Sequence, residues 1–187
     1  GCRNLQFDDC VWGGMVNPKL AVALTGRSGE ALEDYKKLML KLNNEVAAAA
    51  PEDLLINTHV CRGNYHSTFF SSGAYDSVAD LLFGEENVNA YYLEYDDERS
   101  GGFAPLAKVS GDKKVVLGLV TTKTPALENK ELVINRIHEA AKYVPLDRLY
   151  LSPQCGFASC EIGNKLTEEE QWAKLKLVKE IAEEVWG

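Results

Sequence analysis

The sequence predicts an α/β protein built on a parallel β-sheet. Short apolar segments alternate along the chain with longer segments in which apolar residues recur every three or four positions, the spacing of amphipathic helices. The short segments are continuously apolar rather than alternating, which is typical of strands buried on both faces of a parallel sheet. Repeated strand-then-helix order with short connections indicates right-handed crossovers between parallel strands.

Several segments fit the strand and helix patterns closely. The expected strands are Leu5 to Asp8, Leu54 to Cys61, Ala90 to Tyr95, Lys114 to Val120 and Leu149 to Ser152. The expected helices are Gly29 to Ala50, Tyr75 to Phe83, Asn129 to Tyr143 and Thr167 to Trp186. The apolar face of the first helix is expected to hold Leu32, Tyr35, Leu38, Met39, Leu42 and Val46. Thr167 and Glu170 fit a capping box.

Two architectures fit this order of elements. A (β/α)₈ TIM-type barrel normally needs about 250 residues, whereas this chain has 187. Residues 1–187 therefore correspond either to the C-terminal part of a barrel domain, covering about its last five strands, or to a complete open, doubly wound sheet.

Composition limits the partners and the compartment. The chain has 20 basic and 28 acidic residues and a net charge of -8, which argues against nucleic acid as a partner. No apolar run approaches the roughly 20 residues that span a bilayer, and the N-terminal residues lack a signal-peptide pattern. Five cysteines, an odd number, favour thiols or a metal site over disulfides. We therefore expect a cytoplasmic protein with no membrane partner.

Candidate ligands lie at the ends of three expected strands. In Thr58-His59-Val60-Cys61 the histidine and the cysteine are two positions apart, so both side chains point to the same side of the strand. Glu94 interrupts an apolar segment near a strand end, where an unpaired buried carboxylate would be costly. Cys155 follows the last strand, where Gly156 allows a tight turn. Taken singly, each has an ordinary explanation, such as a core cysteine or a hydrogen-bonded histidine.

Taken together, these side chains predict a metal site. Parallel strands bring their carboxyl ends to the same edge, where the active sites of barrels lie. One imidazole, two thiols and one carboxylate suit tetrahedral Zn²⁺. The predicted zinc ligands are His59, Cys61, Glu94 and Cys155. The other cysteines, Cys2, Cys10 and Cys160, show no spacing that indicates a partner.

The same segments resemble those of a known family, the catalytic C-terminal domain of cobalamin-independent methionine synthase. Leu5-Gln6-Phe7-Asp8-Asp9 is similar to its Gln-x-Asp-Glu strand, and His59-Val60-Cys61 to its His-x-Cys pair. Glu94, followed by Arg99-Ser100, stands where the family has its carboxylate ligand. Ser152-Pro153-Gln154-Cys155-Gly156 resembles its Asn-Pro-Asp-Cys-Gly turn. The resemblance runs over essentially the whole chain, which begins at what resembles the fourth of eight barrel strands.

The resemblance implies a zinc-dependent S-methyltransferase. Zinc would bind the thiol of homocysteine and lower its pKa, so that a thiolate exists at neutral pH. The thiolate would attack the methyl group of 5-methyltetrahydrofolate (polyglutamate) and form methionine. The resemblance also implies that Asp8 contacts the amino group of the substrate. The alternative for Asp8 is an acid that ends a strand beside a helix N-terminus.

One segment departs from the family pattern. Where the family has a histidine, its proton donor, in a segment that ends His-Ser-Pro, this chain has Thr121-Thr122-Lys123-Thr124-Pro125. Lys123 is the candidate catalytic residue here, but an unperturbed lysine pKa near 10.4 must fall strongly to serve as an efficient acid near neutrality. The identity of the methyl donor is therefore open. Lys123 is alternatively a binding group for an anionic part of another donor, or a solvated loop residue.

Two further functions stay open beside folate-dependent methyl transfer. One is zinc-dependent alkyl transfer to a thiol from a non-folate donor, such as a corrinoid protein or a small sulfur compound. The other is a non-catalytic truncated barrel, because zinc sites with four protein ligands are often structural. A five-strand part of a barrel leaves its outer strands unpaired, so we expect self-association through these open edges.

Overall fold

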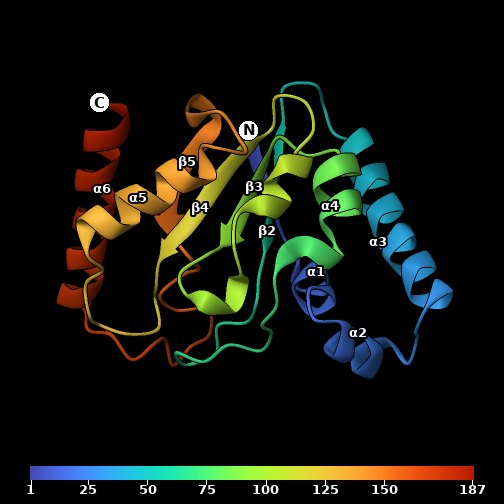
Figure 1. Cartoon of the computed structure of the whole chain (residues 1–187), viewed down its shortest axis with the longest axis horizontal. Helices are drawn as coiled ribbons and strands as arrows, with labels where there is room; N and C mark the ends of the chain where they lie inside the picture. Colours follow the sequence, from blue (N-terminus) through green and yellow to red (C-terminus); the bar gives the residue numbers. More distant parts are fainter.

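The computed structural model describes residues 1–187 and contains one five-stranded parallel sheet (Figure 1). Neighbouring strands in the sheet are also neighbours in the sequence, and all four pairings are parallel. An open doubly wound sheet reverses its strand order at a switch point, so the uninterrupted order excludes that alternative. The strands are β1 (Asn4–Asp8), β2 (Leu55–Val60), β3 (Ala90–Glu94), β4 (Lys114–Val120) and β5 (Leu149–Pro153).

Six α-helices accompany the sheet. Because each crossover leads to the next strand in the same direction, right-handed connections place the helices on one face. The capping box at the start of the last helix is confirmed: Glu170 N–H donates to Thr167 at 3.2 Å, and Thr167 N–H donates to Glu170 at 2.7 Å. None of the helices has the length and apolar composition that crossing a membrane requires. The helices are α1 (Cys10–Met15), α2 (Pro18–Thr25), α3 (Glu30–Ala48), α4 (Ala79–Glu85), α5 (Lys130–Ala140) and α6 (Glu168–Trp186).

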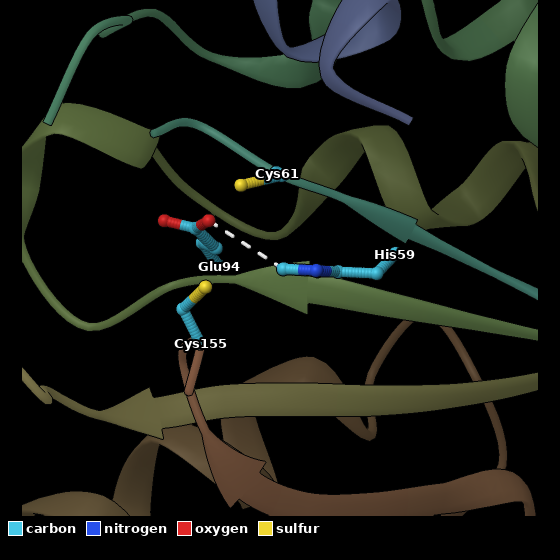
Figure 2. A group of neighbouring side chains, drawn as sticks. All are labelled: His59, Cys61, Glu94 and Cys155. Carbon is cyan, nitrogen blue, oxygen red and sulfur yellow. Dashed lines mark ion pairs between the residues drawn. The ribbon is translucent and has the colours of Figure 1, made fainter. Parts of the chain in front are cut away.

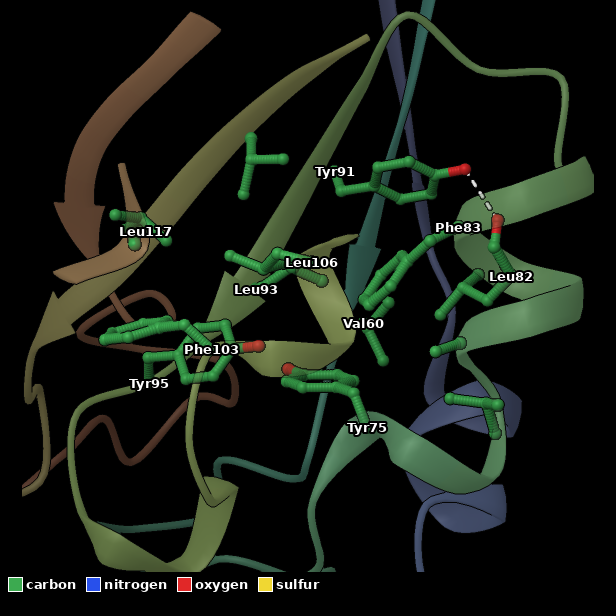
Figure 3. Packing of buried hydrophobic residues seen from close by; sticks show 14 of the residues in the cluster. Val60, Tyr75, Leu82, Phe83, Tyr91, Leu93, Tyr95, Phe103, Leu106 and Leu117 are labelled. Carbon is green, nitrogen blue, oxygen red and sulfur yellow. Dashed lines mark hydrogen bonds between the residues drawn. The ribbon is translucent and has the colours of Figure 1, made fainter. Parts of the chain in front are cut away.

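The helix-covered face of the sheet forms the apolar core. Alternate strand residues such as Tyr91, Leu93 and Leu117 are fully or almost fully buried there. Beside them lies a cluster of aromatic rings (Figure 3). The centroids of its four contacting pairs are 4.7 to 5.7 Å apart. Each such pair contributes about 0.5–1.5 kcal/mol beyond its buried area. The cluster therefore fixes β3 firmly; its members are Tyr75, Phe83, Tyr91, Tyr95 and Phe103.

The opposite face of the sheet is polar and open. Asn57, Tyr92, Lys114 and Tyr150 are among the residues that line a hollow of about 530 Å³ on this face. Apart from this hollow, the residues of the central strands β2, β3 and β4 are largely buried, as predicted. The outer strands β1 and β5 are mostly exposed or half-buried, so the prediction is wrong for them. The reason is that each has a neighbour on one side alone.

The helices differ more than the strands from what the sequence pattern predicts. The pattern misses α1 and α2, which are short and are capped by Asp9 and Asn17. Val78 divides the helix expected from Tyr75 to Phe83 into a 3₁₀ turn, Tyr75–Ser77, followed by α4. In α3 the predicted apolar face is partly wrong, because the buried residues are Leu32, Lys36 and Leu40. Three members of the predicted face are exposed: Leu38, Leu42 and Val46.

Candidate metal centre

Four side chains from three parts of the chain meet at the carboxyl end of the sheet (Figure 2). His59 lies near the end of β2 and Cys61 directly after it, Glu94 is the last residue of β3, and Cys155 follows β5. One ligand atom from each side chain lies within 4.8 Å of the ligand atoms of the other three. The structure thus brings together the four residues that the sequence predicts as ligands.

A glycine in β4 allows the Cys155 turn to approach Glu94. An ideal β-carbon on Gly118 would lie 2.7 Å from both the carbonyl oxygen of Leu93 and the Cα atom of Gln154. Atoms this close overlap, and both are backbone atoms that cannot rotate away. Any side chain at position 118 would therefore separate the two segments that carry Glu94 and Cys155.

Glu94 is fully buried and has hydrogen-bond donors at both carboxylate oxygens. The backbone N–H of Arg62 donates to Oε1 at 2.8 Å, and Nη2 of Arg99 lies 3.4 Å from Oε2. Asp96 in turn holds Arg99, at 2.7 Å. Burial alone would raise the pKa of Glu94, but the nearby His59 imidazole and the hydrogen bond from the Arg62 N–H outweigh it and lower the pKa. The carboxylate is therefore ionised at neutral pH and can bind a cation.

The imidazole of His59 presents one nitrogen to the cluster and the other to a carboxylate. Nδ1 lies 2.9 Å from Oδ1 of Asp8, which is the register partner of His59 in the neighbouring strand. Nε2 is buried without a hydrogen-bond partner, 3.5 Å from Oε1 of Glu94. Burial opposes the charged imidazole, yet the interactions with Asp8 and Glu94 raise the pKa of His59 to about 10. A metal ion at Nε2 fits this site because it would supply the positive charge in place of the proton.

The two thiols of the cluster differ in their protonation. A hydrogen bond from Cys61 lowers the pKa of Cys155 to about 6, and the same pair raises the pKa of Cys61 above its usual range. One thiolate is therefore present near neutral pH. The second proton would be released when a metal binds.

Lys123 lies buried beside the cluster, which rules out a solvated loop lysine. Its ammonium group donates hydrogen bonds to the carbonyl oxygen of Gly63 at 3.1 Å and to Oδ1 of Asn64 at 2.9 Å. The side-chain amide of Asn64 donates to the carbonyl oxygen of Gly156 at 2.6 Å. Lys123 thus connects the segment after β2 with the turn after β5. Burial lowers its pKa.

Three features of the site are absent from the sequence-based prediction. These are the contact between Asp8 and His59, the position of Arg99 beside Glu94, and the thiol of Cys10, which lies within 4.8 Å of the Asp8 and Cys61 ligand atoms. Cys10 follows Asp8 by two residues at the same strand end. The closeness of Cys10 to Asp8 in the sequence could have indicated that Cys10 lies at the site, although the spacing between cysteines does not.

A small hollow adjoins the cluster. It measures about 270 Å³ and is bounded by His59, Tyr92, Gln154 and Cys155, among other residues. Space for a small molecule is therefore available next to two of the four candidate ligands.

The fold and the site define the class of protein. It is an α/β protein with a candidate metal centre, made of largely buried nitrogen, sulfur and oxygen ligands, at the carboxyl end of a parallel sheet. The family model described as the catalytic domain of cobalamin-independent synthase matches residues 31–184. This chain belongs to that family.

Individual relatives agree with the family assignment. YxjG of Bacillus subtilis, a protein of uncharacterised function, is 49% identical over 187 residues, which are 100% of this chain and 49% of YxjG. A 5-methyltetrahydropteroyltriglutamate–homocysteine methyltransferase of Bacillus licheniformis is 24% identical over 83% of this chain and 18% of that protein. The crystal structure of a Listeria monocytogenes protein, provisionally assigned as a vitamin-B12-independent methionine synthase, matches with a TM-score of 0.75 and 40% identity. It covers 100% of this chain and 49% of that one. The chain therefore spans about half the length of YxjG and of the Listeria protein.

Proposed function

We propose that the chain carries the metal-binding part of a zinc-dependent S-methyltransferase that converts homocysteine to methionine. The observation that carries the proposal is the group of four ligand atoms within 4.8 Å of one another, three of them on buried residues. The Bacillus licheniformis relative, whose name specifies homocysteine as a substrate, supports the choice of reaction.

The proposed zinc ligands are His59, Cys61, Glu94 and Cys155. When bound, zinc would lower the pKa of the substrate thiol, so that its thiolate forms at neutral pH. The Arg62 N–H and the Arg99 guanidinium contact the oxygens of Glu94 and would stabilise its carboxylate whether or not it is bound to zinc.

Asp8 is proposed to bind the amino group of homocysteine. One of its oxygens contacts His59, and its side chain is 65% exposed. The exposed part of the carboxylate can accept hydrogen bonds from an ammonium group while the imidazole stays oriented. The hollow beside Cys155 offers space for the short side chain of the substrate.

We further propose a (β/α)₈ TIM-type barrel, to which residues 1–187 contribute about the last five strands as the C-terminal part of the domain. The sequential parallel strand order and the likeness to the Listeria structure support this proposal. In a barrel, the open polar face of the sheet would become the interior. The metal centre would then lie at the end where barrel active sites are found.

The proposed methyl donor is 5-methyltetrahydrofolate (polyglutamate), with Lys123 as the proton donor to the leaving nitrogen. The lowered pKa of Lys123 supports this role. Its hydrogen bonds to Gly63 and Asn64 favour a second candidate, alkyl transfer from a non-folate donor. In that case Lys123 would position the loops rather than transfer a proton.

Metal analysis and a methyl-transfer assay together test these proposals. The purified protein would be incubated with homocysteine and, separately, a methylfolate polyglutamate, a methyl corrinoid and a small methylated sulfur compound, and methionine would be measured. Methionine from the folate alone supports the first candidate, and methionine from another donor supports the second. Bound zinc without transfer from any donor supports the non-catalytic alternative. Full zinc occupancy in a Cys61→Ser, Cys155→Ser double variant would refute the ligand assignment.

A further inference from the structure

A third thiol lies next to the metal centre but outside its ligand set. The Sγ atom of Cys10 lies within 4.8 Å of the Sγ atom of Cys61 and of a carboxylate oxygen of Asp8. Cys10 is exposed, whereas Cys61 is buried. A reagent that arrives from solvent therefore meets Cys10 before Cys61. The first thiol that the modified Cys10 can then contact is that of Cys61.

The backbone holds the two cysteines together from both sides of Cys10. The N–H of Asp9 donates to the carbonyl oxygen of His59 at 2.8 Å and joins the start of α1 to the end of β2. One turn later, an ideal β-carbon on Gly13 would overlap the carbonyl oxygen of Cys61. The first turn of α1 is thus pressed directly against the segment that carries Cys61. Their proximity is a consequence of the fold and not of two mobile surface side chains.

The geometry points to Cys10 as an oxidation site that removes Cys61 from the metal centre by forming a disulfide with it. This inference rests on the proposed function, because it takes Cys61 to be a metal ligand. The oxidant it requires is a peroxide. Disulfide sulfurs are about 2 Å apart, so side-chain rotation has to bring the two sulfurs into bonding contact.

The reaction balances in two steps. Hydrogen peroxide first oxidises the Cys10 thiol to a sulfenic acid, as the O–O bond breaks and water is released. The Cys61 sulfur then attacks the Cys10 sulfur; the S–S bond forms and the S–O bond breaks. The departing hydroxide leaves as water after taking a proton from solvent, because a Cys61 sulfur that binds zinc has already released its own proton. The two thiols together lose two electrons, and the peroxide gains them.

Such a disulfide would make the metal content of the protein depend on the peroxide concentration. Only three of the four candidate ligands would remain, and a site with one thiolate fewer holds zinc less tightly. Reduction by a dithiol would restore Cys61 through thiol–disulfide exchange and allow zinc to bind again.

Disulfide mapping on the zinc-loaded chain tests the inference. A Cys2→Ser, Cys160→Ser background removes the two cysteines outside this group. Zinc content is measured first; the protein is then treated with hydrogen peroxide, its free thiols are alkylated, and a non-reducing digest is analysed by mass spectrometry. We expect a peptide that links Cys10 to Cys61, with zinc release that a dithiol reverses. In the matched Cys10→Ser variant the linked peptide should be lost and zinc release should slow.

The other outcomes contradict either the inference or the proposed function. A link between Cys61 and Cys155 in place of the expected one, no link at all, or equal zinc release with and without Cys10 would overturn the inference. A protein that holds no zinc before oxidation counts against the proposed function instead. The disulfide is then judged on the mapping alone.

Discussion

Glu86 is a buried acid whose ionisation is expected to weaken the fold at neutral pH. It follows α4 and is fully buried. The side-chain amide of Asn43 donates to its Oε1 atom at 2.8 Å, but its Oε2 atom has no hydrogen-bond partner. Burial is the main reason that its pKa rises from 4.5 to about 7, and the nearby charge of Asp9 adds to the increase.

The direction and size of the pH effect follow from this shift. An acid whose pKa is higher in the folded state costs nothing where both states are protonated, and it destabilises the fold progressively as pH rises through the interval between the two pKa values. The interval runs from 4.5, the unperturbed value, to about 7. At about 1.4 kcal/mol per pKa unit, the full cost is on the order of 3 kcal/mol, and most of it develops between about pH 5 and pH 8.

The Glu86→Gln substitution removes the ionisation while retaining the size of the side chain. Urea unfolding at about pH 5 and pH 8 would give the free energy of unfolding of both proteins. We expect the variant to gain about 2 to 3 kcal/mol relative to the parent between these pH values. A constant offset from altered hydrogen bonds cancels in this comparison, and so do all other titrating groups. A free-energy difference between variant and parent that does not change with pH would refute the reasoning.

Four further outcomes test the metal centre and the fold. His59→Ala should reduce the bound zinc from about one ion per chain to almost none by elemental analysis. Asp8→Asn should weaken zinc binding about 10- to 100-fold in competition with a chelator, and unchanged affinity would argue against an orienting role. Gly13→Ala should lower the free energy of unfolding by about 1–3 kcal/mol, whereas Gly84→Ala, whose β-carbon would meet no atom within 4 Å, should not. Sedimentation should show the isolated chain self-associating and a Leu5→Lys variant on the outer strand β1 associating less; a monomeric parent would contradict this expectation.

The central strands were predictable because a strand that is buried on both faces is a continuous apolar segment in the sequence. β2, β3 and β4 have two neighbours each and read as unbroken apolar segments, so their ends agree with the structure within a residue or two. The first two helices were not predictable from periodicity, since six or eight residues contain too few turns to establish it. Their capping residues, Asp9 and Asn17, were the available indication.

The ligand set could be predicted because each ligand follows or ends an apolar strand, and strand order alone brings such positions together. The partners of the ligands could not be predicted in the same way. The contact between Asp8 and His59 depends on the register between two strands, which no local pattern specifies. The position of Arg99 beside Glu94 depends on a short turn after β3. The burial of Lys123 could not be predicted, because it comes from packing against a segment distant in the sequence, at Gly63 and Asn64.

The apolar core and the metal centre are linked through the two-residue period of the strands. In β3, Tyr91 and Leu93 point into the aromatic core, whereas Tyr92 and Glu94 point to the open face. A shift of one residue in register would exchange these two sets and move Glu94 away from its hydrogen-bond donors into the apolar core. The cost of burying an unpaired carboxylate in such a place is several kcal/mol. The packing on the helix-covered face therefore selects the register that assembles the metal ligands on the opposite face. Substitutions in that core, although distant from the ligands, should change the geometry of the metal centre because they shift β3.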